Sequence, residues 1–261
     1  MGGSTPVAIT AGWDRSMCFW DARAPAAALS TVALPERVFC MDVRGNDMVV
    51  CTAPEAQGGG GFGSRVHIFD LRNHNAPVRS VVSPLKYQSR AVRIFGDGLL
   101  YALGSIEGRC KINALRASED EAKQVGDPQQ RPLCFAFRCH RDARLVYPVN
   151  AIDCFPSADP QRTPVFATAG SDGVVTLWNR RERQKIKDMA VEPTAPPLQG
   201  PEGIPVKQRQ PITDVRFSGD GALLACAASY DWSRGPDSFD RAAQPYIYVK
   251  NLTPEYLTVK K

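Results

Sequence analysis

The residue types in this sequence that could carry out chemistry are turn aspartates, three histidines and eight cysteines. Asp14 and Asp172 each lie in a tight turn between two extended runs, where an aspartate side chain accepts hydrogen bonds from nearby backbone N–H groups. We therefore interpret both as turn residues and not as an acid–base pair. No Ser/His/Asp or Cys/His set has a catalytic spacing, and no glycine loop precedes a helix as a phosphate site requires. The sequence predicts a protein that is not an enzyme and has no small-molecule substrate.

A zinc site is the other chemistry to consider, because Cys134, Cys139 and His140 are close in sequence. No two cysteines form a CxxC pair, and Cys134 lies in an alternating Leu-Cys-Phe-Ala-Phe pattern typical of a strand. We therefore expect buried free thiols, no metal and no cofactor. His67 alternates within a strand and His74 lies in an Asn-rich turn, whereas His140 is expected to join the turn network of the neighbouring repeat.

The stretch 169–179, Ala-Gly-Ser-Asp-Gly-Val-Val-Thr-Leu-Trp-Asn, predicts a β-hairpin. An Asp-Gly pair between β-branched and aromatic residues is a strong hairpin signal, because glycine accepts the positive φ that such a turn requires. The same order of strand, turn and strand recurs along the chain. The closing positions of five copies are expected at Trp20, Phe69, Asn113, Trp178 and Val249.

These copies resemble WD repeats, in which a small-residue strand and an Asp turn precede a strand ending in Trp-Asp. The first two intervals approach the roughly 40–45 residues of a WD blade, and the longer ones contain the loops 116–131 and 190–210. A glycine-rich loop is expected at 58–61. We expect an all-β fold, with residues 1–261 forming a single, incomplete WD-repeat β-propeller domain. About four complete blades follow a partial first one that begins at its second strand, and roughly two N-terminal blades of the usual seven are missing.

Composition permits a folded domain and sets few limits on partners. Apolar residues make up 43% of the 261 residues, enough for a sizeable core. The formal charge of +5 is compatible with RNA or an acidic peptide but demonstrates neither. No run of about 18 apolar residues predicts a membrane span, and the N-terminus lacks a signal-peptide pattern. We expect a soluble, intracellular protein.

Several segments are more specific than the repeat. They are Leu-Pro-Glu-Arg at 34–37, Ser-Pro-Leu-Lys-Tyr-Gln-Ser-Arg at 83–90, Ala-Leu-Gly-Ser-Ile-Glu-Gly-Arg at 102–109, Phe-Arg-Cys-His-Arg at 137–141, Tyr-Pro-Val-Asn-Ala at 147–151 and Ser-Tyr-Asp-Trp-Ser-Arg-Gly at 229–235. Over nearly the whole chain they resemble the family shared by the Rae/Gle mRNA-export factor and the Bub-type mitotic checkpoint propeller. The first and last segments favour the export factor.

The resemblance implies an interaction module that binds the GLEBS segment of a nucleoporin and takes part in mRNA export, with possible contact to single-stranded RNA. It implies a location in the nucleus and at the nuclear envelope and nuclear pore, with shuttling to the cytoplasm. The alternative function is a spindle-checkpoint adaptor that binds GLEBS motifs of checkpoint kinases. Checkpoint kinases and ubiquitin stay open as further partners.

Five residues are predicted to bind the peptide. Arg109 matches the family arginine that pairs with an acidic side chain of the bound motif, and Glu107 belongs to the same segment. From the residues alone, the alternative is an internal ion pair between them, since a guanidinium suits any carboxylate. Lys86, Tyr87 and Arg90 combine cations with an aromatic ring, as interfaces often do, but a solvated strand start is an equal alternative.

Four residues are predicted to contact nucleic acid. Tyr230, Trp232 and Arg234 share a polar turn, and an aromatic ring beside a cation is suited to stacking on a base next to a phosphate. The alternative for Trp232 is packing within its own loop. Lys250 could extend the positive surface or be simply solvated.

Overall fold

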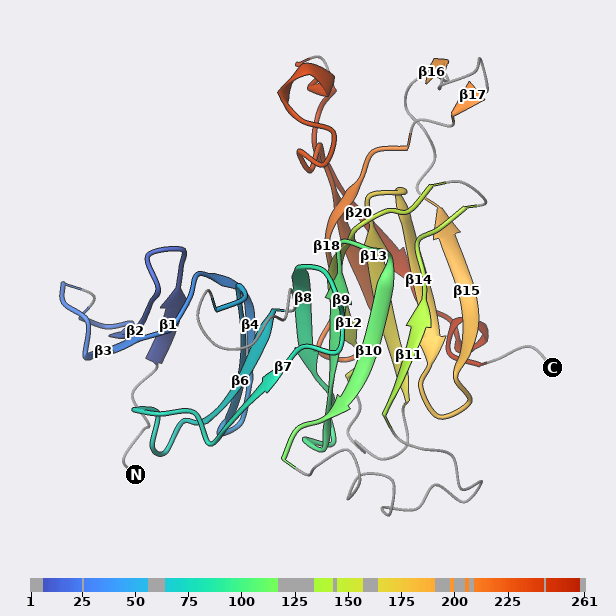
Figure 1. Ribbon diagram of the computed structural model, residues 1–261. Coiled ribbons are helices and arrows are strands. Elements are labelled where there is room, and N and C mark those ends of the chain that lie inside the picture. The colour runs from blue at the N-terminus through green and yellow to red at the C-terminus, as the bar shows by residue number, and fades with distance from the viewer. Residues whose placement is uncertain are drawn as a thin grey trace. The chain divides into compact units, whose positions relative to one another are not determined.

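The computed structural model describes residues 7–24, 26–55, 64–116, 134–142, 145–156, 164–190, 198–199, 205–206, 209–241 and 243–258 (Figure 1). The chain divides into two compact units, Met1–Ser89 and Arg90–Lys261. Regular structure is almost entirely β-strand, with short 3-10 helices at Pro236–Ser238 and Pro254–Tyr256. Within the described ranges, no helix has the length and apolar character needed to span a membrane. The expected loop at 58–61 and residues 117–131 lie outside these ranges.

The first unit contains two antiparallel sheets. One has the order β1-β2-β3 and the other β4-β5-β6-β7. A core cluster of both sheets includes Met17, Phe19, Met48, Val50 and Phe69, which are at most 5% exposed. The strands are β1 (Val7–Ala11), β2 (Ser16–Asp21), β3 (Ser30–Ala33), β4 (Val38–Arg44), β5 (Asp47–Thr52), β6 (Arg65–Asp70) and β7 (Arg79–Val82).

The second unit contains two four-stranded sheets, β11-β10-β9-β8 and β12-β13-β14-β15, and a three-stranded sheet, β18-β19-β20. Two very short strands, β16 and β17, pair with each other. The strands are β8 (Ser89–Ile94), β9 (Leu100–Ser105), β10 (Arg109–Ala114), β11 (Phe135–Arg138), β12 (Val149–Cys154), β13 (Val165–Gly170), β14 (Val174–Asn179), β15 (Gln184–Ala190), β16 (Leu198–Gln199), β17 (Pro205–Val206), β18 (Ile212–Phe217), β19 (Leu223–Ala228) and β20 (Tyr246–Asn251).

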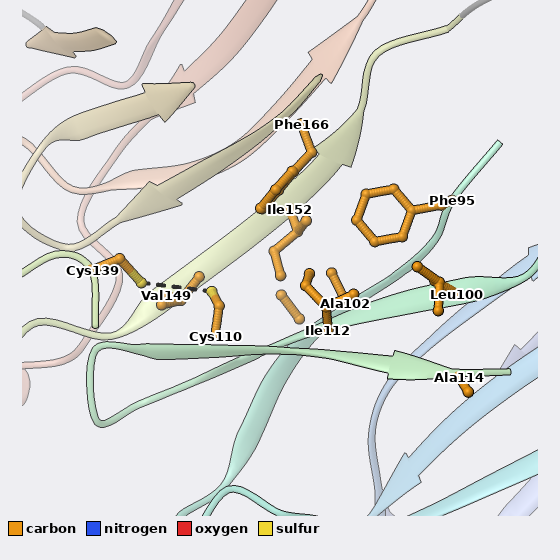
Figure 2. Close-up of a cluster of buried hydrophobic side chains, with 11 residues drawn as sticks. Phe95, Leu100, Ala102, Cys110, Ile112, Ala114, Cys139, Val149, Ile152 and Phe166 are labelled. Carbon is orange, nitrogen blue, oxygen red and sulfur yellow. Dashed lines mark hydrogen bonds between the residues drawn. The ribbon is translucent and has the colours of Figure 1, made fainter. Parts of the chain in front are cut away.

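The sheets of the second unit pack through apolar side chains between neighbouring blades. Figure 2 shows Phe95, Ile152 and Phe166 gathered between the β8–β11 and β12–β15 sheets, and the rings of Phe95 and Phe166 meet edge to face at 5.6 Å. The approach is close at Gly104, where an added Cβ would lie 2.7 Å from Val149 Cγ1. A second cluster, including Leu177 and Ile212, joins the β12–β15 and β18–β20 sheets.

The all-β class and the antiparallel WD-type blades are confirmed. The predicted hairpin is formed by β13 and β14, and Gly173 has the expected positive φ of 70°. The first sheet, β1-β2-β3, has three strands among the described residues, as expected for the partial first blade. The last sheet differs from a full blade, because β18-β19-β20 has three strands in the part of the chain described here.

One repeat marker is wrong by a single residue. Trp20, Phe69, Asn113 and Trp178 each occupy the fifth position of their strand, and each pairs with the second residue of the preceding strand. In the last sheet the corresponding pair is Leu224 with Lys250, so Lys250 and not Val249 closes that copy. The closing residue of the fifth copy is a lysine within the strand Tyr-Ile-Tyr-Val-Lys-Asn, so no Trp or Phe marks the position, and a one-residue slip moves every side chain to the other face.

Replacing Phe166 by alanine is expected to lower the free energy of unfolding by about 3–5 kcal/mol, because it opens a cavity between two blades. Phe166 is 1% exposed, so the lost contacts are not replaced by water. Urea unfolding followed by tryptophan fluorescence measures the change. Leu99→Ala is the control, since Leu99 is 56% exposed. Equal losses for the two variants would contradict the assigned core.

Candidate peptide and nucleic-acid interface

Four connections of the second unit lie at the same end of its sheets. They are the turn between β9 and β10, the connection from β11 to β12, the turn between β13 and β14, and the long connection from β19 to β20, which is drawn at the top of the unit in Figure 1. Antiparallel pairing brings alternate connections of a sheet to one end. Every predicted site residue of this unit except Lys250 lies at this end, which we call the turn face.

A buried histidine fixes the turn between β13 and β14. His140 Nδ1 lies 2.9 Å from Asp172 Oδ1, and His140 Nε2 lies 2.8 Å from Thr168 Oγ1. Trp178 Nε1 donates to the same Thr168 oxygen at 2.9 Å. The prediction that His140 joins the turn network of the next repeat is confirmed. Burial disfavours the charged imidazole, but the hydrogen bond and charge of Asp172 outweigh it and raise the pKa of His140.

A second polar cluster holds the β19–β20 connection against the tips of the neighbouring blade. Asp231 Oδ2 accepts hydrogen bonds from Asn150 Nδ2 at 3.0 Å and from Ser171 Oγ, while Oδ1 accepts from Ser233 N and Oγ at 3.1 and 2.7 Å. Burial raises the pKa of Asp231, but these donors outweigh it and lower the pKa overall. Arg90 Nη2 donates to the Asp231 carbonyl at 3.3 Å. This predicted peptide residue therefore contacts the connection that carries Trp232.

Trp232 projects from that connection with 59% of its surface exposed. Its ring stacks on Phe239 with centroids 5.0 Å apart and planes at 17°, and it meets Tyr230 at 5.3 Å. Tyr230 Oη donates to the Gly235 carbonyl at 2.5 Å, which ties the loop to itself. The Trp232 ring thus contacts its own loop and still presents a large surface to solvent.

Two cations predicted with Trp232 lie in different places. Arg234 lies two residues after Trp232 in the β19–β20 connection, and its charge acts against burial and Asp142, which raise the pKa of Tyr147. Lys250 lies four residues along β20 from Tyr246, about 13 Å at 3.3 Å per residue. Its Nζ lies 5.9 Å from the ring of Tyr256, at the opposite end of the sheet. The structure does not bring Lys250 to Trp232.

Arg109 lies where β10 begins, directly after the turn. Its Nε is 3.6 Å from Glu107 Oε2, so the internal ion pair considered from the sequence is present. The contact is longer than a hydrogen bond, and within the described ranges this buried Nε has no hydrogen-bond partner. The Arg109 side chain remains 39% exposed. The guanidinium is therefore held in place but keeps donors for a further carboxylate.

Arg141, which sequence reasoning did not single out, braces this turn. Its Nε donates to the Gly108 carbonyl at 3.0 Å and its Nη2 to the Glu107 carbonyl at 2.5 Å. Gly108 has a φ of 60°, and an added Cβ would lie 2.8 Å from the Cys139 carbonyl oxygen. Arg141 belongs to the Phe-Arg-Cys-His-Arg segment, but its partner lies on another strand connection. The sequence therefore placed Arg141 in a family segment but did not predict that it binds the β9–β10 turn.

In the first unit, Lys86 and Tyr87 lie together in the connection after β7. Lys86 Nζ is 5.6 Å from the centroid of the Tyr87 ring, which is 49% exposed. A second exposed pair was missed: Trp13, 68% exposed in the β1–β2 turn, lies under the guanidinium of Arg37 at 5.8 Å. The sequence features that could have indicated this pair are a tryptophan in a predicted turn and an arginine in the Leu-Pro-Glu-Arg segment.

The residues considered for zinc do not gather around a common centre. Cys139 Sγ lies 3.6 Å from Cys110 Sγ, while His140 is bonded to Asp172 and Thr168. In the part of the chain that the structure describes, no three His, Cys, Asp or Glu side chains are placed to hold a metal ion.

No family model matches the sequence. The chain is 34% identical over 241 residues to mRNA export factor GLE2 of Chaetomium thermophilum, a match that covers 89% of the chain and 55% of that relative. It is 33% identical over 253 residues to mitotic checkpoint protein BUB3.1 of Arabidopsis thaliana, covering 94% and 62%. It is 32% identical over 256 residues to protein Rae1 of Drosophila melanogaster, covering 95% and 62%.

Over 89% to 95% of its length, the chain matches WD-repeat proteins of the Rae/Gle export-factor and Bub-type checkpoint family. It spans between 55% and 62% of the length of these three relatives. The comparisons therefore confirm the family that the ordered segments suggested.

The raised pKa of His140 predicts a stability term that depends on pH. A group whose folded pKa exceeds its unfolded value stabilises the fold fully below the unfolded value, and this stabilisation is lost as pH rises through the folded pKa. We expect His140→Gln to cost more free energy of unfolding near pH 5.5 than near pH 8.5, values on either side of the unfolded pKa of about 6.5. Urea unfolding of both proteins at the two pH values measures this difference.

A cost for His140→Gln that stays constant or grows with pH would contradict the pairing with Asp172. His74→Gln is the matched control, because it makes the same substitution at an imidazole that contacts Ser30 and Phe19 in the first unit.

Proposed function

We propose that this chain is a non-enzymatic interaction module of mRNA export, which binds a GLEBS-type nucleoporin segment on its turn face. The observation that carries the proposal is Arg109. Its guanidinium is partly exposed, is placed by a turn that Arg141 braces, and has Glu107 as a loose partner at 3.6 Å. Such a group can accept a carboxylate from a bound segment with little rearrangement, which reduces the entropy lost on binding.

Family membership supports the same proposal. The relatives include an mRNA export factor and a mitotic checkpoint protein, both named for roles outside enzymatic catalysis. A nucleoporin partner and a role in export place the protein in the nucleus and at the nuclear pore, with shuttling to the cytoplasm. Glu107 and Arg90 lie on the same face of the second unit as Arg109. Lys86 and Tyr87, which are also predicted to bind the peptide, belong to the first unit.

Replacing Arg109 by alanine is expected to weaken binding of a synthetic GLEBS peptide by about 2–5 kcal/mol, the range for truncating one partner of a desolvated charge pair. Isothermal titration calorimetry with the purified chain measures the affinity. Arg181→Ala is the matched control, because Arg181 is an exposed arginine in the turn after β14, at the other end of the sheets. Equal affinities of Arg109→Ala and Arg181→Ala would remove Arg109 from the site.

We also propose that Trp232 and Arg234 contact single-stranded RNA. Stacking of a base on an exposed tryptophan contributes about 1–3 kcal/mol, and each phosphate contact steepens the dependence of affinity on salt. Trp232→Ala should therefore weaken binding of an oligouridine with little change in salt slope, whereas Arg234→Ala should flatten the slope. Fluorescence anisotropy over a salt series measures both quantities.

Lys250→Ala tests how far the RNA extends. Because Lys250 lies at the opposite end of β20, it should change neither affinity nor slope if the RNA stays on the turn face. A flat salt titration of the unaltered chain would contradict direct RNA binding altogether.

A checkpoint adaptor is the second candidate, favoured by the 33% identity to the mitotic checkpoint protein over 94% of the chain. In this role the same turn face would bind a GLEBS motif from a checkpoint kinase. Titrating nucleoporin and kinase peptides against the same protein distinguishes the two functions, because the physiological partner is expected to bind more tightly.

A further inference from the structure

Two thiols lie against each other beneath the turn that carries Glu107 and Arg109. Cys110 and Cys139 are 0% and 6% exposed, and their Sγ atoms are 3.6 Å apart. Figure 2 shows the two sulfur atoms facing each other at one end of the apolar cluster, beside Val149. Cys110 is the second residue of β10 and Cys139 follows directly after β11, so they belong to neighbouring strands.

The backbone also holds these two residues together. Cys139 N donates to the Gly108 carbonyl at 3.1 Å, and Cys110 pairs with Phe137 in the β10–β11 ladder. Residues 137 and 139 project to the same face of the ladder, because side chains alternate along a strand. A disulfide requires the sulfur atoms to close to about 2.05 Å. Cys139 follows directly after β11, so a small movement of this residue alone can bring the two sulfur atoms together.

The chemical environment distinguishes the two thiols. The hydrogen bond from Cys110 lowers the pKa of Cys139 and outweighs burial. His140 and Arg141 act in the same direction as Cys110, and Asp172 opposes them. Complete burial raises the pKa of the Cys110 thiol. Cys139 is also the less completely buried residue of the pair. A thiolate beside cations with a second thiol in reach is the arrangement of a redox-sensitive pair.

We propose that Cys110 and Cys139 form a reversible disulfide when the protein meets hydrogen peroxide. The Cys139 thiolate attacks one peroxide oxygen, the O–O bond breaks, hydroxide leaves and a sulfenic acid forms. Cys110 loses its proton and attacks the Cys139 sulfur, the S–O bond breaks and water leaves. The two sulfur atoms are oxidised by two electrons in total and peroxide is reduced to water. A thiol reductant reverses the step by exchange.

This modification would link β10 to the β11–β12 connection directly below the Arg109 turn. The single S–S bond would then reinforce the hydrogen bond between Cys139 N and the Gly108 carbonyl, which joins the same two segments. The proposal does not depend on peptide binding, and the experiment below measures no binding, so its outcome is separate from that of the proposed function.

The test exposes the native chain to hydrogen peroxide, blocks remaining thiols with N-ethylmaleimide and digests the protein without reductant for mass spectrometry. We expect a Cys110–Cys139 linked peptide, lighter than its two components by two hydrogens, which dithiothreitol removes. Cys154→Ser is the matched control and should retain the linkage, because Cys154 is a half-buried thiol of the same unit.

A second variant tests the order of attack separately from formation of the disulfide. Cys110→Val preserves an apolar side chain of similar size in the core, removes the resolving thiol and should let dimedone trap a sulfenic acid on Cys139. Absence of the linked peptide from the oxidised native chain would overturn the proposal. Trapping on Cys154 or Cys134 in place of Cys139 in the Cys110→Val protein would overturn the assigned order of attack.

Discussion

The buried carboxylate of Asp231 is the interaction on which the turn face of the second unit depends. An ionised carboxylate out of water is tolerable only when donors surround it, and Asn150, Ser171 and Ser233 supply them. These donors come from β12, from the β13–β14 turn and from the loop of Asp231 itself. The same contacts that satisfy the charge therefore fix the start of the β19–β20 connection against the neighbouring blade. Trp232, the next residue, projects from a fixed base.

A similar principle operates at the other turns of this face. His140 and Asp172 pair under the β13–β14 turn, and Arg141 binds the two carbonyls of the β9–β10 turn. At the β9–β10 turn and in the β19–β20 connection, a polar side chain positions the backbone while a different residue beside it remains exposed. Arg109 and Trp232 are those exposed residues. Rigid turns present their side chains without a large entropic cost on binding, which supports the proposed peptide site.

Local patterns predicted the hairpins well, because an Asp-Gly turn and alternating strands are encoded by adjacent residues. The place of His140 in the turn network of the next repeat was also predictable from the repeat pattern. The register of β20 was not, because its closing residue is a lysine and not the tryptophan or phenylalanine that marks three of the other copies. The contacts of Asp231, Arg141 and the Cys110–Cys139 pair depend on segments far apart in sequence, and no local pattern reports them. Arg109 was identified through a family segment, and its ion pair with Glu107 was one of the two alternatives that the sequence suggested.

The central claim is that the turn face of the second unit receives a peptide segment. Hydrogen–deuterium exchange of the chain with and without a saturating GLEBS peptide tests it most directly. Binding at the turn face should slow exchange in the segments that meet there, which are 105–110, 139–142, 145–147 and 229–239. Protection confined to the opposite end of the sheets, at 96–99, 180–183 and 218–222, would contradict it, as would unchanged exchange throughout with the peptide bound.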